Sequence, residues 1–436
     1  MTSRRPKAFR EVFVWIWLPA AVEPVVAGRI AREGELFVFN YGRSYLSRPD
    51  RRPIYLSELP LKPGAIAPEA PLEIAGCLRD GSPDAWGRRV IVNRLTGLAA
   101  DDAGAFDLDE ITFMLASGSD RAGSLDFQAS PSVYVSREPT GATLDDLSEA
   151  AARVERGEPI PPALDRALLH CSSIGGSRPK ALIGQSARKF IAKFSATNDT
   201  YAVVKAEYVA MRLARLAGLN AAPVELASAG GKDVLLVERF DRAWTPAGWT
   251  RRSAVSALTI FGLGEMQAHY ASYSDLADIV RARFASARRT LRELFARMVF
   301  NVLVGNNDDH ARNHAAFWDG EKLELTPAYD ICPQARGGRE TNQAIFIVGA
   351  DRRSLLETCR TAAPRFHLRD REARDVVEEQ VDCIRREWRN VCDEAALSEV
   401  DRSFLWRRQF LNDYAFEGFA GGTMNRCPVE PCVSRS

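Results

Sequence analysis

The sequence lacks the features that mark membrane proteins and zinc-bound modules. It contains no apolar run as long as the roughly 18 residues that a membrane-spanning helix needs. Its most apolar stretch, EVFVWIWLPAAVEPVVAG, carries two glutamates and two prolines, which is typical of a strand and turn. The eight cysteines form no C-x-x-C pair, so the usual zinc-binding spacing is missing. We therefore expect a cytoplasmic protein with reduced thiols and no membrane contact.

Lysine is also scarce. Eight of the 58 basic residues are lysines, and this bias toward arginine is typical of a coding preference. The formal net charge is +1, so no overall field favours nucleic acid as a direct partner. Each lysine is nevertheless informative, because arginine cannot replace a compact ammonium group at every kind of site.

The 436 residues are enough for two or three domains. Residues 1–135 contain alternating and apolar runs that predict a β-rich N-terminal subdomain. Residues 136–240 contain short strands and one strong helix that Gly218 ends. Residues 241–420 have a mainly helical pattern, whereas residues 421–436 have no periodicity and are expected to be disordered.

The densest group of polar residues is VLVGNNDDHARNHAAF, residues 302–317. It follows an amphipathic helix, and within it Asp308 and Asn313 form D-x-x-x-x-N. Protein kinases use this spacing in their catalytic loop, where the aspartate orients the acceptor hydroxyl and the amide binds magnesium. A predicted hairpin about an Asp-Gly turn comes next, and Asp330 follows it. Kinases carry a metal-binding aspartate after such a hairpin, so the order of these elements indicates phosphoryl transfer.

Two other interpretations of this stretch stay open from the residues alone. Asparagine and aspartate also gather in polar turns after helices, in which case Asp309 would be more exposed than Asp308. A metal hydrolase could instead use Asp308, Asp309, His310 and His314, of which the two histidines form H-x-x-x-H. The motif H-E-x-x-H is absent, however, and His314 begins a predicted strand. The hydrolase therefore ranks below the kinase.

A second group of residues favours the kinase. Lys193 lies inside the apolar strand FIAKF, and a buried lysine is costly without an anionic partner. Glu207, near the start of the following helix, is the candidate partner, as in the lysine–glutamate pair of kinases. Before this strand, SSIGGSRPK places Gly175 and Gly176 where backbone N–H groups can approach phosphate oxygens, although the Walker A pattern is absent.

These segments resemble the HipA-like serine/threonine kinases, the toxin components of HipBA toxin–antitoxin systems. The resemblance rests on five motifs in order: SSIGGSRPKALI, EYVAMRLARLAGL, LLVERFDR, NVLVGNNDDHARNHAAF and LTPAYDICP. FNYGRSYLSRPD and PDAWGRRVI are similar to the family's N-terminal subdomain. The resemblance implies an α+β, protein-kinase-like fold with two lobes, an N-terminal β-rich subdomain and an all-helical C-terminal lobe. The Gly loop and the ATP lysine would lie in a kinase N-lobe over residues 136–240.

The resemblance also implies roles for single residues. Asp308 is expected to be the catalytic aspartate, and Asn313 and Asp330 to bind Mg²⁺. Glu207 is expected to pair with Lys193. The residues expected at the ATP are Gly175, Gly176, Ser177, Arg178, Pro179, Lys180, Lys193, Glu238, Arg239, Phe240, His310, Asn313, Tyr329 and Asp330. Among them, residues 175–180 would form the phosphate loop, and residues 238–240 the hinge whose backbone meets adenine. Ser173 is the expected autophosphorylation site, with Ser172 and Ser177 as alternatives.

The function that the resemblance implies is an ATP- and Mg²⁺-dependent protein kinase toxin, partnered by a HipB-like helix-turn-helix antitoxin. Its substrate would be a translation component such as an aminoacyl-tRNA synthetase, and operator DNA would be reached mainly through the antitoxin. A weakly active co-repressor and a small-molecule kinase are the alternatives. Two departures from the family pattern stand out, namely Asp309 where a small residue is commoner, and Pro179, which removes one N–H from the loop.

Overall fold

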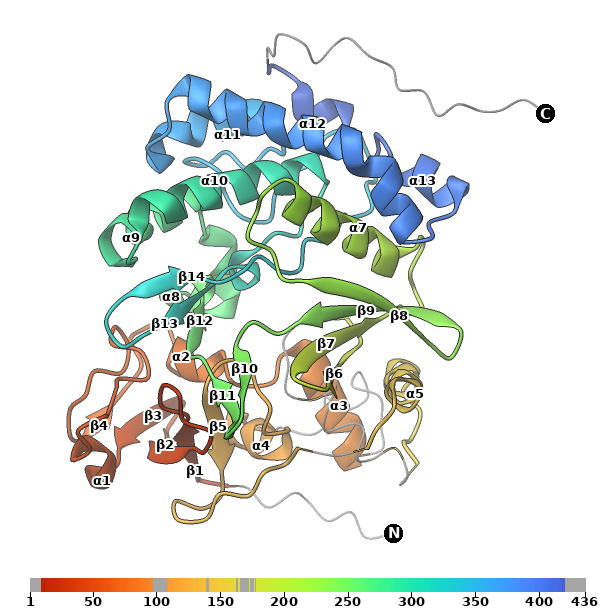
Figure 1. Cartoon of the computed structure of the whole chain (residues 1–436). Coiled ribbons are helices and arrows are strands. Elements are labelled where there is room, and N and C mark those ends of the chain that lie inside the picture. Colours follow the sequence, from red (N-terminus) through yellow and green to blue (C-terminus); the bar gives the residue numbers. More distant parts are fainter. Residues whose placement is uncertain are drawn as a thin grey trace.

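The computed structural model describes residues 9–96, 108–138, 141–161, 164, 172, 176 and 178–419. Its N-terminal part is an antiparallel sheet with the strand order β4-β3-β2-β1-β5, accompanied by short helices (Figure 1). Gly28 lets β2 and β3 pair closely, because a Cβ there would lie 2.1 Å from the carbonyl oxygen of Asn40. The elements are β1 (Glu11–Ile16), β2 (Val25–Glu33), β3 (Leu36–Tyr41), α1 (Arg43–Leu46), β4 (Ala65–Ile66), α2 (Gly76–Arg79), α3 (Ala85–Thr96), α4 (Glu110–Ala116) and β5 (Leu125–Gln128).

A second antiparallel sheet, with the order β6-β7-β9-β8, forms a small lobe. Helix α7 packs on β8 and β9, and it buries Val204, Tyr208 and Met211. The helix ends at Leu216, and Gly218 follows with φ +83°, so the predicted stop is confirmed. The elements of this lobe are α5 (Leu144–Glu155), β6 (Lys180–Gln185), β7 (Arg188–Phe194), α7 (Val203–Leu216), β8 (Val224–Ala229) and β9 (Lys232–Glu238).

The C-terminal lobe is mainly helical, and its long helices α10 and α12 lie together in Figure 1. The predicted stripe on α10 is confirmed, since Leu291, Leu294 and Met298 are buried. The helices are α8 (Ala257–Ile260), α9 (Tyr273–Arg283), α10 (Ala287–Leu303), α11 (Leu356–Ala362), α12 (Asp370–Glu394) and α13 (Glu399–Leu405). The 3-10 turns are η2 (Glu265–Tyr270), η3 (Ala311–Asn313), η4 (Ala363–Phe366) and η5 (Asp413–Phe416).

The two-lobed, mixed α and β architecture is confirmed, but the expectation of an all-helical C-terminal lobe is wrong in detail. The lobe contains the hairpin β10 (Arg242–Thr245) and β11 (Gly248–Arg251). It also contains a three-stranded sheet of β12 (Ala254–Ser256), β13 (Ala315–Trp318) and β14 (Leu323–Leu325). The hairpin predicted after the polar loop is β13–β14. The free edge of β13 offers unpaired N–H and C=O groups, and β12 pairs with that edge as a third strand.

The N-terminal subdomain shares its core with the rest of the molecule. One large apolar cluster runs from β1 and β3 through α7 to α10 and α12. A smaller cluster joins α3 and α5 to β6, β7 and β9. At its centre the fully buried Trp86 of α3 donates from its indole nitrogen to the carbonyl of Lys180, at 3.0 Å. The N-terminal subdomain therefore helps to hold the strand on which the candidate site begins.

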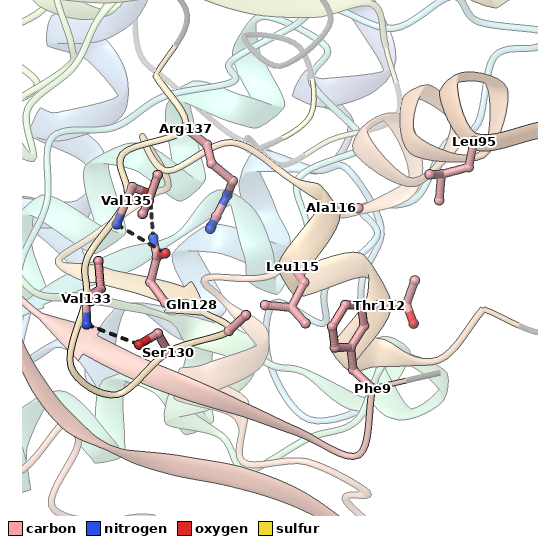
Figure 2. A pocket seen from close by; sticks show the side chains of 11 residues that line it. Phe9, Leu95, Thr112, Leu115, Ala116, Gln128, Ser130, Val133, Val135 and Arg137 are labelled. Atoms are coloured by element: carbon pink, nitrogen blue, oxygen red, sulfur yellow. Dashed lines mark hydrogen bonds between the residues drawn. The ribbon is translucent and has the colours of Figure 1, made fainter. Parts of the chain in front are cut away.

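A groove of about 620 Å³ lies against α4 and β5 of the N-terminal subdomain (Figure 2). Its lining is mainly apolar and includes Phe9, Leu95, Leu115, Val133 and Val135. None of the residues expected at the nucleotide lines it, so this groove is separate from the candidate site. In the described part of the chain, no helix is both long and apolar enough to cross a membrane.

Candidate functional site

Lys193 lies at the centre of the candidate site. Its ammonium group, on β7, donates to Glu207 Oε1 of α7 at 2.5 Å and to Asp330 Oδ1, which is 137 residues further along the chain. Lys193 and Glu207 are both buried. Burial alone would lower the pKa of Lys193, but Asp330 and Glu207 outweigh it and hold that pKa above its ordinary value. Lys193 is therefore charged at neutral pH, and it links the small lobe to the C-terminal lobe.

The backbone fixes Asp330 in an unusual conformation. Its φ is +60°, in the left-handed region that residues other than glycine seldom adopt. Two residues earlier, the N–H and C=O of Ala328 bond to the connection between α7 and β8 at 2.7 and 2.9 Å. Burial alone would raise the pKa of Asp330, but Lys193 and Lys180 outweigh it and hold that pKa well below its usual range. The site thus presents a charged carboxylate at a defined position.

In the loop after α10, the two side chains expected to act in the reaction differ in solvent exposure. Asp308 is exposed to solvent, whereas Asn313 is buried at the end of η3. The amide nitrogen of Asn313 donates to the carbonyl of Asp308 at 3.4 Å, so its amide oxygen is the atom suited to a metal ion. Partial burial raises the pKa of Asp308 above its ordinary value; His310 opposes this effect, and Asp330 adds to it. A carboxylate that is reachable and has a raised pKa is suited to accept a proton.

The exposure of the two neighbouring aspartates is the reverse of that expected for a polar turn. Asp309 is buried, and Asp308 is the exposed one. The carboxylate of Asp309 accepts from the Tyr273 hydroxyl, and its Oδ1 lies 2.9 Å from His314 Nε2. Asp309 and His314 are therefore buried and bonded to each other. This contact removes two of the four side chains on which the metal-hydrolase interpretation depends.

Gly176 brings the expected phosphate loop against Lys180. The glycine has φ +119°, and a Cβ on it would lie 1.7 Å from the ammonium nitrogen of Lys180, so a side chain there would displace the lysine. Lys180 is buried and stands opposite Lys193 in the β6–β7 register. Asp84, at the start of α3, lies on the same side, and burial raises its pKa to about 6 although Lys180 opposes that shift. The N-terminal subdomain therefore contributes a carboxylate near Lys180.

The rest of the expected phosphate loop is only partly described. Arg178 forms an ion pair with Asp199 at 2.6 Å, and the carbonyl of Pro179 accepts from the N–H of Phe194 at 3.0 Å. Both contacts fix the entry into β6. Three expected site residues lie outside the described residues, namely Ser173, Gly175 and Ser177.

The segment after β9, expected as the adenine hinge, turns its arginine away from solvent. The Arg239 guanidinium is buried and bonds to Asp241 at 2.8 and 2.9 Å and to Asp120 of the N-terminal subdomain at 3.0 Å. Glu238 pairs through its backbone N–H with the carbonyl of Pro223 at 2.9 Å. The Arg239 side chain is therefore held inside the protein by these carboxylates and does not face a bound base.

Aromatic rings pack between this segment and the residue that precedes Asp330. The rings of Phe240 and Tyr329 have centroids 5.7 Å apart, and Phe240 also contacts Phe317 at 5.8 Å. The hydroxyl of Tyr329 donates to the carbonyl of Arg312 at 2.7 Å. This bond ties the segment that carries Asp330 to the loop that carries Asn313.

The oxygen donors at the site fit a magnesium ion. Asn313 offers an amide oxygen and Asp330 a charged carboxylate, and Mg²⁺ is usually bound through one or two such groups together with substrate phosphates and water. No group of three or more His, Cys, Asp or Glu side chains that could hold a metal ion by themselves occurs among the described residues.

Sequence reasoning missed the contribution of the N-terminal subdomain and of α9. Asp84 belongs to PDAWGRRVI and Asp120 to no recognised motif, but the sequence neighbours of neither residue indicate that Asp84 lies near Lys180 or that Asp120 bonds to Arg239. No sequence pattern indicates that Tyr273 bonds to Asp309 either. The one available signal was Asp309 itself, an acidic residue at a position where a small residue is commoner.

Two protein-family models match the chain. The HipA N-terminal domain matches residues 18–128, and the HipA-like C-terminal domain matches residues 172–388. The Y4mE protein of Sinorhizobium fredii (strain NGR234) is 32% identical over 150 residues, which cover 32% of this chain and 33% of that protein. The serine/threonine-protein kinase toxin HipA of Shewanella oneidensis is 26% identical over 183 residues, which cover 36% of this chain and 42% of that protein. The matched regions thus span less than half the length of these relatives.

A solved structure shares the fold along nearly the whole chain. It is HipA of Shewanella oneidensis MR-1, in a complex with HipB and operator DNA. The TM-score is 0.61 with 18% sequence identity, and the match covers 91% of this chain and 95% of that one. Because the N-terminal and C-terminal HipA domain models both match in one polypeptide, over residues 18–128 and 172–388, the chain belongs to the HipA-like family.

Proposed function

We propose that this protein is an ATP- and Mg²⁺-dependent serine/threonine kinase and the toxin of a toxin–antitoxin pair. The observation that carries the proposal is the bridge from Lys193 to both Glu207 and Asp330. The pairing of a strand lysine with a helix glutamate, together with a metal-binding aspartate beside the lysine, is the arrangement that active protein kinases require.

In the proposed mechanism, each group has a task that its position suits. Lys193 and Lys180 would bind phosphate oxygens in place of their present carboxylate neighbours, and Asn313 and Asp330 would hold the metal. The bound metal would supply charge neutralisation on the phosphates. Asp308, exposed at the mouth of the site, would orient the acceptor hydroxyl and take up its proton. Most of the rate enhancement would come from positioning and electrostatics.

The biological role is proposed by analogy with relatives. A curated relative is named a serine/threonine-protein kinase toxin, and the solved HipA is bound to HipB and operator DNA. By that analogy this chain would act in the cytoplasm, pair with a HipB-like helix-turn-helix antitoxin and reach operator DNA through it. Its substrate would be a translation component such as an aminoacyl-tRNA synthetase.

Autophosphorylation at Ser173 forms part of the proposal, and the neighbouring Ser172 is a poor alternative. Ser172 is buried, and its hydroxyl oxygen accepts from the N–H of Gly118 in the N-terminal subdomain, at 3.1 Å. Transfer to Ser172 would first require that contact to open. Phosphate on Ser173 would silence the kinase by displacing the loop that carries Gly176.

The test of the proposed function is transfer of the γ-phosphate of labelled ATP, with and without Mg²⁺, followed by mapping of phosphopeptides in wild-type and Ser173→Ala proteins. We expect Mg²⁺-dependent label that Ser173→Ala largely removes. A weakly active co-repressor would bind its antitoxin without label in any protein, and a small-molecule kinase would consume ATP without labelling protein. Label that persists in Ser173→Ala would move the site to another serine.

We expect Asp120→Asn to weaken nucleotide binding more than the chemical step. Asp120 is shared by Arg239 at 3.0 Å, Arg242 at 2.9 Å and Lys189 at 2.6 Å, and removing its charge leaves these cations buried with too few partners. If the backbone after β9 binds adenine, a loss of ~1 kcal/mol of ATP binding free energy raises the KM for ATP about fivefold. Steady-state kinetics over a range of ATP concentrations measures this change.

The matched control for that variant is Asp50→Asn, which removes an exposed ion pair with Arg48 in the same subdomain. We expect the control to leave the KM for ATP unchanged, because exposed pairs contribute little. An Asp120→Asn protein with the wild-type KM would show that the buried charges do not position the hinge.

A further inference from the structure

The buried carboxylate of Asp309 is the centre of a hydrogen-bonded group behind the catalytic loop. It accepts from the Tyr273 hydroxyl, at the start of α9, and its Oδ1 lies 2.9 Å from His314 Nε2, just before β13. All three residues are buried. A buried carboxylate is stable only when its oxygens have such partners, and His314 and Tyr273 outweigh burial and lower the pKa of Asp309.

The group continues from Tyr273 to the segment that carries Asp330. Asn301, on the last turn of α10, donates from Nδ2 to the Tyr273 hydroxyl at 3.4 Å. Asn306 donates from Nδ2 to Asn301 Oδ1 at 3.0 Å and to the carbonyl of Asp330 at 3.4 Å. A continuous set of buried side chains therefore connects Asp309 to the backbone of the expected metal-binding aspartate.

Rigid elements hold both ends of this group. The N–H of Tyr273 donates to the carbonyl of Phe346 at 2.8 Å, and the carbonyl of His314 accepts from the N–H of Ala257 at 2.7 Å. The rings of Tyr273 and His314 also pack edge to face, with centroids 5.3 Å apart. Through Tyr273 and His314, Asp309 is thus connected to α9, to the first residue of α8 and to the start of β13.

The positions of Asp309 and His314 in the loop determine what their contact does. Asp309 directly follows Asp308, and His314 directly follows Asn313. The bond between Asp309 and His314 therefore closes residues 309–314 into a loop. Asp308 directly precedes this loop, and Asn313 is its last residue before His314. The same hydrogen-bonded group also contacts the backbone of Asp330, through the bond from Asn306 to the Asp330 carbonyl.

We propose that Asp309, through His314 and Tyr273, is a positioning residue that sets the separation between the proton-accepting Asp308 and the metal-binding pair Asn313 and Asp330. The inference rests on the proposed kinase function and deepens it. Asp309 itself faces away from solvent and does no chemistry on the substrate. Its loss leaves the functional side chains present but incorrectly spaced, and such displacements lower catalytic rates strongly.

The experiment compares Asp309→Asn and Tyr273→Phe with wild-type protein in two measurements. The first is kcat for phosphate transfer at saturating ATP as a function of Mg²⁺ concentration. The second is calorimetric titration with ADP, with and without Mg²⁺, which needs no turnover. We expect each variant to lower kcat about tenfold, the equivalent of ~1.4 kcal/mol. The Mg²⁺ concentration for half-maximal rate rises, and Mg²⁺ no longer strengthens ADP binding as it does in the wild type.

The matched control is Tyr41→Phe, which removes another buried hydroxyl, one that donates to the carbonyl of Leu59 at 2.8 Å in the N-terminal sheet. We expect Tyr41→Phe to lower the stability of the protein about as much as Tyr273→Phe does, and to leave the Mg²⁺ dependence of kcat unchanged. Wild-type kcat and Mg²⁺ dependence in Asp309→Asn and Tyr273→Phe overturn the inference and leave the proposed function intact. A wild-type protein that binds ADP regardless of Mg²⁺ and transfers no phosphate overturns both.

Discussion

Replacing Asp308 with alanine is expected to abolish phosphate transfer and to leave the fold intact. Asp308 is the exposed carboxylate of the loop, and in the proposed mechanism it orients the acceptor hydroxyl and takes its proton. Loss of a positioned general base lowers the rate by about a hundredfold to ten-thousandfold. Burial and the negative charge of Asp330 already disfavour the ionised form of Asp308, so its removal is not expected to destabilise the protein.

The measurement is transfer of labelled phosphate by Asp308→Ala, with thermal unfolding as the check on the fold. Asp382→Ala, which removes an exposed aspartate on α12, is the control and should transfer at the wild-type rate. Binding of ATP to Asp308→Ala should persist, because the phosphate and metal contacts come from other residues. Autophosphorylation of Asp308→Ala at the wild-type rate would overturn the assignment of this residue.

Replacing Lys193 with methionine is expected to abolish activity and also to weaken folding. Lys193 is buried between Glu207 and Asp330, so its removal leaves carboxylates without their cation. Breaking a buried ion pair in this way typically costs about 3–5 kcal/mol of stability. Activity is lost because no ammonium group on β7 remains to bind the phosphates.

A double variant separates these two effects. In Lys193→Met with Glu207→Gln, the buried carboxylate of α7 becomes a neutral amide, so we expect a large part of the lost stability to return. Activity should stay absent in the double variant, since the lysine is still missing. Urea unfolding measures the first effect and labelled ATP the second. Phosphate transfer by Lys193→Met at the wild-type rate would show that the lysine has no role in catalysis.

The sequence by itself determined the local elements and their order. The apolar stripe of α10, the hairpin β13–β14 and the end of α7 at Gly218 depend on side chains within a few positions of one another. The spacing from Asp308 to Asn313 could also be interpreted before the fold was known, because it reflects a short loop geometry. Recognition of the family followed from the order of such local motifs.

Only the tertiary structure decided which side chains meet. It placed Asp330 on Lys193 across 137 residues, buried Asp309 rather than Asp308, and turned Arg239 toward Asp120 of the N-terminal subdomain. None of these contacts has a periodic or spaced signature, since each depends on how distant elements pack and on which buried charge finds a partner. The sequence therefore determined the chemical groups of the site, and the packing of three distant segments determined their arrangement.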